Sequence, residues 1–143
     1  VREDILKSAI AWKVAFITAK EIDEMNILRA TWKAMHEALS GLGKQPGFII
    51  VDGNRFIPYN NIPFQTIVRG DGLYYSIAAA SVLAKTARDE YMEMLHEEYP
   101  DYGWNRNKGY GTSMHRLAIV KYGITPYHRR SFTLTDNQLV LDF

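Results

Sequence analysis

Two short apolar runs, each followed by an aspartate with a neighbouring glycine, constrain the fold of this chain. Residues 48–51 (FIIV) are continuously apolar, which is typical of a strand buried on both faces of a sheet, and Asp52 follows them. Residues 66–68 (TIV) form a second run, with Asp71 shortly after it. About a dozen residues separate the two runs, which is roughly the shortest crossover between parallel strands. The runs therefore predict a pair of parallel strands, although a hairpin stays open at this point.

Helical patterns surround these two runs. An acidic stretch opens the helical spacing of residues 21–42, and residues 72–98 predict a long helix. Residues 112–122 predict a shorter helix, which a glycine ends. Residues 11–19 (AWKVAFITA) have the apolar and β-branched content of another strand. This order of strands and helices predicts an α/β layer.

The composition excludes several classes of protein. With 143 residues and 47% hydrophobic content, the chain has enough apolar side chains for one domain's core. No cysteine is present, which excludes disulfides, zinc–thiolate sites and cysteine nucleophiles within these residues. We find neither a membrane-spanning apolar run nor a secretory leader, and we expect a cytoplasmic protein.

Asp52 and Asp71 are the candidate metal ligands. If the two strands are parallel neighbours, both carboxylates emerge at the carboxyl edge of the sheet, where open α/β sheets bind ligands. Hard carboxylate oxygens suit Mg²⁺ or Mn²⁺. Simple turn formation also explains an aspartate beside glycine, and a hairpin would place the two at opposite ends. The adjacent pair Asp23 and Glu24 is better explained by capping of a helix start than by catalysis.

A glycine-flanked tyrosine is the candidate nucleic-acid contact. In Lys108-Gly109-Tyr110-Gly111-Thr112, the glycines permit close backbone approach, and Tyr110 offers a ring for stacking and a hydroxyl. Equally, Thr112 has the character of a helix N-cap, with Tyr110 as its hydrophobic staple.

Basic residues are concentrated in the last part of the chain. From residue 101 onward there are six Lys or Arg against three Asp or Glu, which suits a polyanion but is also common in other proteins. The run His128-Arg129-Arg130 is either a phosphate contact or a surface feature of the C-terminal segment, and we favour the second interpretation.

Six segments, taken in this order, resemble bacterial ribonuclease HII. They are EIDEMNIL (21–28), VDGN (51–54), RGD (69–71), SIAAASVLAK (76–85), KGYGT (108–112) and HRRSF (128–132). The resemblance implies an α/β fold with an RNase H-like mixed sheet flanked by helices and a helical C-terminal extension. It also implies hydrolysis of the RNA strand in RNA–DNA hybrids and incision on the 5′ side of single ribonucleotides in duplex DNA, using Mn²⁺ or Mg²⁺.

The resemblance assigns roles to individual residues. Asp52 and Asp71 match the third and fourth of the family's four metal-binding catalytic carboxylates. Tyr110 matches the tyrosine that stacks at the ribonucleotide junction and helps to sense the 2′-hydroxyl, and Lys108 and Gly109 belong to the same nucleic-acid-binding motif.

One part of the family pattern has no match in these residues. The first two carboxylates of the family form an Asp-Glu pair followed by Gly-Arg-Gly, and no segment here corresponds to it. We therefore expect a single RNase H-like domain over residues 1–143, truncated on its amino-terminal side, whose isolated chain is inactive and poorly stable. The alternatives are a non-catalytic nucleic-acid-binding fragment of the same fold and a divergent metal-binding α/β domain.

Overall fold

The computed structural model describes residues 1–130, and these residues form two compact units. The first unit combines Val1–Phe16 with Thr31–Thr86, and the second combines Ile17–Ala30 with residues 87–130.

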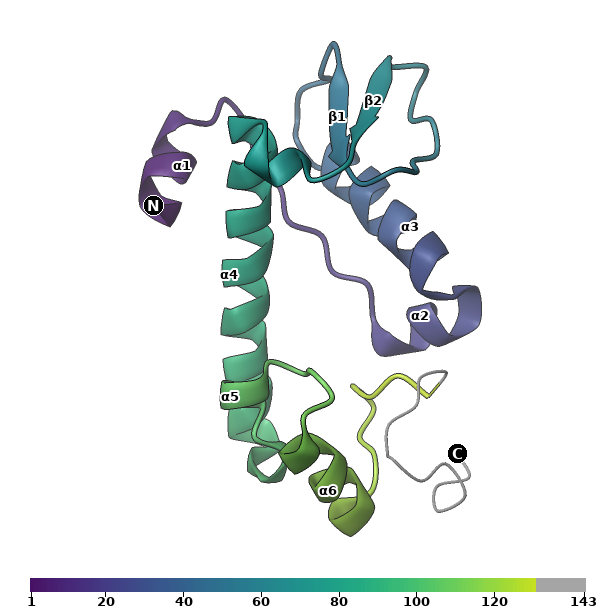
Figure 1. Cartoon of the computed structure of the whole chain (residues 1–143), viewed down its shortest axis with the longest axis vertical. Coiled ribbons are helices and arrows are strands. Elements are labelled where there is room, and N and C mark those ends of the chain that lie inside the picture. The colour runs from purple at the N-terminus through teal and green to yellow at the C-terminus, as the bar shows by residue number, and fades with distance from the viewer. Residues whose placement is uncertain (131–143) are drawn as a thin grey trace. The chain divides into compact units, whose positions relative to one another are not determined.

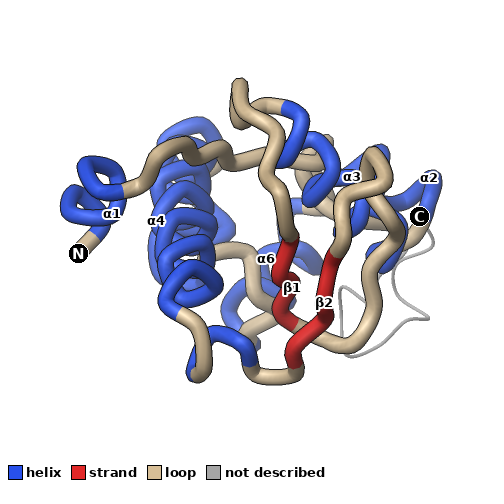
Figure 2. The backbone as a smooth tube through the Cα atoms, turned by 90° about the horizontal axis from the view of Figure 1, so that it is seen from above, coloured by secondary structure: helices blue, strands red, loops and turns tan. Residues whose placement is uncertain are grey.

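The first unit contains a parallel strand pair, β1 (Ile49–Asp52) and β2 (Phe64–Ile67), seen side by side in Figures 1 and 2. Their register pairs Ile49 with Phe64 and Asp52 with Ile67. The apolar run predicts β1 to within one residue, whereas β2 begins two residues before the predicted run.

Packing on one side of β1 forms the core of this unit. The buried side chains of Ile49, Val51 and Ile62 pack against partly buried hydrophobic side chains, which are Met35, Leu39, Phe56, Tyr59 and Phe64. Met35 and Leu39 lie four residues apart on α3 (Ile27–Ser40), the spacing that puts both on one face of a helix. The unit also contains α1 (Arg2–Ser8), the 3₁₀ turn η1 (Gly70–Gly72) and the first half of α4 (Tyr75–Glu98).

The second unit is built around aromatic side chains. It contains α2 (Ala19–Met25), the second half of α4, η2 (Pro100–Tyr102), α5 (Trp104–Asn107) and α6 (Ser113–Tyr122). Its buried cluster consists of Leu95, Tyr102, Trp104, Ala118 and Ile119. The prediction for α6 is confirmed: the Thr112 side chain accepts a hydrogen bond from the His115 backbone N–H, and Gly123 ends the helix at φ +82°.

Three sequence expectations about local structure are wrong. Residues 11–18 do not form a strand, because no other described strand lies alongside to pair with their backbone. The single helix expected from residue 21 is two helices, separated by Asn26 at φ 78°. Asp23 and Glu24 do not cap a helix start; Thr18 and Glu21 form the capping box of α2, and the Asn26 side chain accepts from the Arg29 N–H.

Within the described residues, every helix is too short or too polar to cross a lipid bilayer.

Candidate functional site

Asp52 and Asp71 lie at the same edge of the first unit's strand pair. Asp52 is the last residue of β1, and Asp71 lies in η1, which follows β2 after a short turn. Because β1 and β2 are parallel, their carboxyl ends lie at one edge, so the condition for a shared site is met and the hairpin alternative is wrong. Both side chains are exposed.

A hydrogen bond joins the two aspartate segments. The Gly70 backbone N–H donates to Asp52 Oδ1 at 2.9 Å, so the carboxylate of Asp52 fixes the turn that carries Asp71. Arg69 adopts a left-handed conformation, φ 55°, which turns the chain from β2 into η1. Gly70 is buried, and an added Cβ there would lie 2.6 Å from Ile77 Cδ1. Glycine therefore permits the close approach of η1 to α4.

These two carboxylates fit part of a divalent-cation site. Asp52 has a second oxygen beyond the one that accepts from Gly70, and hard oxygen ligands suit Mg²⁺ or Mn²⁺. Across residues 1–130, however, no group of three His, Cys, Asp or Glu side chains is placed to hold a metal ion. The described residues therefore do not form a closed coordination shell of such side chains.

The loop of residues 108–112 lies in the second unit, and its conformation depends on consecutive left-handed residues. Lys108 has φ 53° and Gly109 has φ 86°. The Gly109 N–H donates to Asn107 Oδ1 at 2.8 Å, while Asn107 Nδ2 donates to the Tyr102 carbonyl at 2.7 Å. Buried Asn107 thus connects the loop to the aromatic core. Tyr110 is 63% exposed, so it is available to a ligand.

Arg88 of α4 contacts the same loop and lies against one face of the Tyr110 ring. Its guanidinium lies 4.5 Å from the centroid of the Tyr110 ring. Its Nη1 donates to the Tyr110 hydroxyl at 3.3 Å, and its Nη2 donates to the Lys108 carbonyl at 3.0 Å. Sequence reasoning missed Arg88, because the residue lies 22 positions before Tyr110 with no local motif to connect them.

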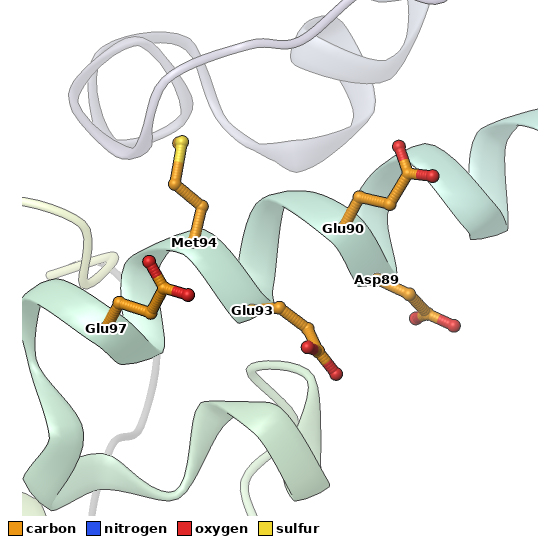
Figure 3. A pocket seen from close by; sticks show the side chains of 5 residues that line it. All are labelled: Asp89, Glu90, Glu93, Met94 and Glu97. Carbon is orange, nitrogen blue, oxygen red and sulfur yellow. The ribbon is translucent and has the colours of Figure 1, made fainter.

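The Lys108 side chain forms an ion pair with an acidic neighbour. Its Nζ lies 3.3 Å from Glu93 Oε1, one of the carboxylates along the exposed face of α4. Figure 3 shows this acidic row, which is made up of Asp89, Glu90, Glu93 and Glu97, with Met94 among them. The row repels a polyanion, and Glu93 partly neutralises Lys108. Lys108 is therefore a candidate nucleic-acid contact whose charge is shared with Glu93.

The C-terminal basic run divides into interior and surface residues. His128 is 6% exposed and packs in the aromatic cluster, so it is not a surface phosphate ligand. Burial lowers the pKa of Arg129, as does nearby Arg88, whereas Asp23 raises it. The Arg130 backbone N–H donates to Asp23 Oδ2 at 2.9 Å, so Asp23 anchors this run. Ser131 and Phe132 of the predicted motif lie outside the described residues.

A large apolar groove opens beside β1 in the first unit. Its volume is about 900 Å³, and Asp52 lies on its wall together with apolar side chains from β1, α3, α4 and residues 11–15. Trp12 and Val14 line one part, and Ile49 and Val51 another. In the described residues β1 pairs only with β2, which leaves its second edge without a strand partner.

Comparison with known proteins identifies a family. A family model described as Ribonuclease HII matches residues 3–135. The ribonuclease HII of Christiangramia forsetii is 61% identical over 94% of this chain and 68% of its own length. That of Bacteroides thetaiotaomicron is 56% identical over 100% of this chain and 72% of its own length.

A solved structure shares the fold. The ribonuclease H2 from Pyrococcus horikoshii superposes with a TM-score of 0.77 at 22% sequence identity, covering 93% of this chain and 70% of that one. The expected RNase H-like fold, of which β1 and β2 are the described strands, is thereby confirmed.

Proposed function

The chain belongs to the ribonuclease HII family of metal-dependent endoribonucleases. We therefore propose that it is part of a nuclease that cuts the RNA strand of RNA–DNA hybrids. The proposed reaction includes incision on the 5′ side of a single ribonucleotide in duplex DNA, in the cytoplasm. The shared edge of Asp52 and Asp71 is the observation that carries this proposal.

In the proposed site, the carboxylate oxygens of Asp52 and Asp71 would hold Mn²⁺ or Mg²⁺. When bound, such an ion would supply activation of water and stabilisation of the leaving oxygen for in-line displacement at phosphorus. Asp52 has a second role in this chain, because its Oδ1 accepts from Gly70 and thereby fixes the position of Asp71.

Tyr110 is the proposed reader of the ribose. Its hydroxyl oxygen accepts a hydrogen bond from Arg88, which leaves the hydroxyl proton to donate to a 2′-hydroxyl. The exposed ring supplies a stacking surface for a nucleotide. A 2′-hydroxyl is the group that distinguishes RNA from DNA at such a contact.

We also propose that residues 1–143 belong to one RNase H-like domain whose amino-terminal strands are not among them. Three observations support this. The relatives extend beyond the matched region, since the alignments cover 68% and 72% of their lengths. The second edge of β1 has no strand partner among the described residues, and an apolar groove runs along it to Asp52. A strand added there would cover the groove and bring further carboxylates beside Asp52.

Fusion to the unmatched part of the Bacteroides thetaiotaomicron relative tests the proposal. We expect the fusion to cut a duplex that contains one ribonucleotide, with Mn²⁺ or Mg²⁺, and to leave the all-deoxy duplex intact. Substitutions D52N and D71N in the fusion are expected to lower the cleavage rate at least a hundredfold. The amide of D52N still offers an oxygen to the Gly70 N–H, so its unfolding temperature should stay close to that of the parent.

Full cleavage by the D52N and D71N fusions would contradict the proposed metal site. D89N, in the acidic row of α4, is the matched control, because it removes a carboxylate that the proposal does not use. Its cleavage rate is expected to equal that of the unsubstituted fusion.

A second function is favoured by the small number of ligands. Since no trio of metal-binding side chains forms in residues 1–130, the chain alone is a candidate nucleic-acid-binding fragment that does not cut. Binding that weakens with added salt, without Mn²⁺-dependent cleavage even in the fusion, would favour this second function.

A further inference from the structure

Two buried histidines of the second unit touch each other directly. His115 of α6 is 5% exposed and His128 is 6% exposed, and their Nε2 atoms lie 3.0 Å apart. Tyr102 and Trp104 pack around the pair, with ring centroids 5.0–6.2 Å from the histidine rings. In a buried pair of this kind, the tautomer of each ring is determined by its neighbours, because each ring nitrogen needs a hydrogen-bond donor or acceptor that matches it.

The hydrogen-bond partners fix which nitrogens carry protons. The Thr125 backbone N–H donates to His128 Nδ1 at 2.9 Å, so the proton of neutral His128 is on Nε2. His128 Nε2–H then donates to His115 Nε2, which also accepts from Trp104 Nε1–H at 3.1 Å. His115 therefore carries its proton on Nδ1.

The Nδ1 proton of His115 forms a hydrogen bond with the loop of residues 108–112. His115 Nδ1–H donates to the Tyr110 carbonyl at 2.9 Å. The same carbonyl accepts from the Thr112 N–H at 2.8 Å. The chain of hydrogen bonds thus runs from Thr125 through both histidines to the backbone of Tyr110, the residue whose side chain is exposed to a ligand.

We propose that His115 is a positioning residue for ribonucleotide recognition: it holds the Tyr110 backbone in the tautomer that Trp104 and His128 together set. This inference rests on the proposed role of Tyr110. The loop needs such a restraint, because Lys108 and Gly109 are both left-handed and Gly111 follows the tyrosine. A fixed carbonyl restrains the direction of the Tyr110 side chain, since the two are separated by one backbone atom.

Equilibrium binding tests the inference on the full 143-residue chain. The probes are a fluorescein-labelled DNA duplex that contains one ribonucleotide and the same duplex in all-deoxy form, with anisotropy as the signal. The unsubstituted chain is expected to prefer the first duplex, and Y110A is expected to lose this preference. We expect H115A to reduce this preference about three- to tenfold, which is the effect of losing one hydrogen bond. If the preference of the unsubstituted chain is itself smaller than that, H115A should abolish it. The affinity for the all-deoxy duplex should not change.

Rescue by a conservative variant separates positioning from general stability. In H115N the side-chain amide N–H occupies the place of Nδ1–H, so the bond to the Tyr110 carbonyl is retained and the preference should return. H36A is the matched control. His36 belongs to the first unit, where its Nε2 lies 2.9 Å from the Ile57 carbonyl, and it takes no part in the network around His115. Its duplex preference should be that of the unsubstituted chain.

Nuclear magnetic resonance of the unsubstituted chain supplies a measurement that needs no variant to fold. Long-range ¹H–¹⁵N correlations should show His115 protonated on Nδ1 and His128 protonated on Nε2. The opposite tautomer at either ring would overturn the inference, as would equal preference of H115A and the unsubstituted chain.

The outcomes distinguish this inference from the function on which it rests. If Y110A loses the preference and a folded H115A keeps it, the positioning role is wrong and the function of Tyr110 stands. If the unsubstituted chain has no preference, or Y110A keeps it, the proposed role of Tyr110 fails. In that case the inference is overturned as a statement about recognition, whatever the tautomers are.

Discussion

Tyr110 owes its position to side chains from three segments of the second unit. Asn107 binds the backbone at Gly109, Arg88 contacts the ring and the hydroxyl, and His115 binds the carbonyl. An exposed aromatic ring held this closely loses little conformational freedom on binding, which favours affinity. The restraints also make the loop sensitive to small changes in its backbone.

Gly109→Ala is expected to weaken recognition through the backbone. The residue has φ +86°, and the added Cβ would lie 3.2 Å from Met92 Cε. We expect a loss of stability of about 1 kcal/mol and a reduced preference for the ribonucleotide duplex, measured by urea unfolding and anisotropy. Gly123→Ala is the matched control, because φ is +82° there and nothing lies within 4 Å. A similar loss of preference in both variants would contradict this account of the loop.

The histidine pair predicts a fall in stability in mild acid. Burial, together with the nearby His115, lowers the pKa of His128 to about 4, and burial also lowers the pKa of His115. Between an unfolded pKa of about 6.5 and pH 4 the unfolded chain binds a proton that the folded chain does not. The free energy of unfolding therefore falls as pH falls through this window, by roughly 1 kcal/mol per pH unit for His128.

Urea unfolding at pH 7.5 and pH 5 measures this effect. His115, Tyr102, Trp104 and Thr125 are the groups that face His128, and none of them is an acid that would stabilise its cation. H128N, which keeps an acceptor for the Thr125 N–H, should flatten the profile. Equal stability at the two pH values would contradict the prediction.

At the scale of elements, the position of η1 depends on a glycine packed against α4. Gly70→Ala places a Cβ 2.6 Å from Ile77 Cδ1, in a side chain that is 5% exposed. We expect a destabilisation of about 1–3 kcal/mol and weaker Mn²⁺ binding, because Asp71 shifts with the turn.

A double-mutant cycle tests this contact. Ile77→Val removes the Cδ1 atom and costs about 1 kcal/mol by itself. In the pair G70A/I77V we expect the two losses to be less than additive, as measured by thermal unfolding. Strict additivity would mean that the steric contact is not the cause.

Elements with strong local signals were predictable from the sequence. Continuous apolar residues predict β1, and the Thr112 cap and Gly123 predict both ends of α6. Residues 11–18 mislead, because strand composition cannot supply a strand partner. The break at Asn26 was missed because helical spacing continues across it. Within the candidate site, the aspartates and Tyr110 carry motifs, whereas Arg88 and His115 act through contacts that only the folded chain creates.

At the scale of the whole molecule, we predict that the 143-residue chain alone is inactive and only marginally stable. An apolar groove of about 900 Å³ and an unpaired strand edge are features that a stable protein covers. We expect strong binding of an apolar fluorescent dye and no Mn²⁺-dependent cleavage of the ribonucleotide duplex. The intact mass of the sample is measured first, since 16.4 kDa identifies this chain without additions. Robust cleavage at that mass would refute the prediction.

The contact between Arg88 and Tyr110 makes the two faces of the tyrosine ring unequal. The guanidinium lies over one face of the ring, so in the proposed recognition a nucleotide has only the opposite face on which to stack. One arginine therefore makes the tyrosine a one-sided surface, with room for a single base.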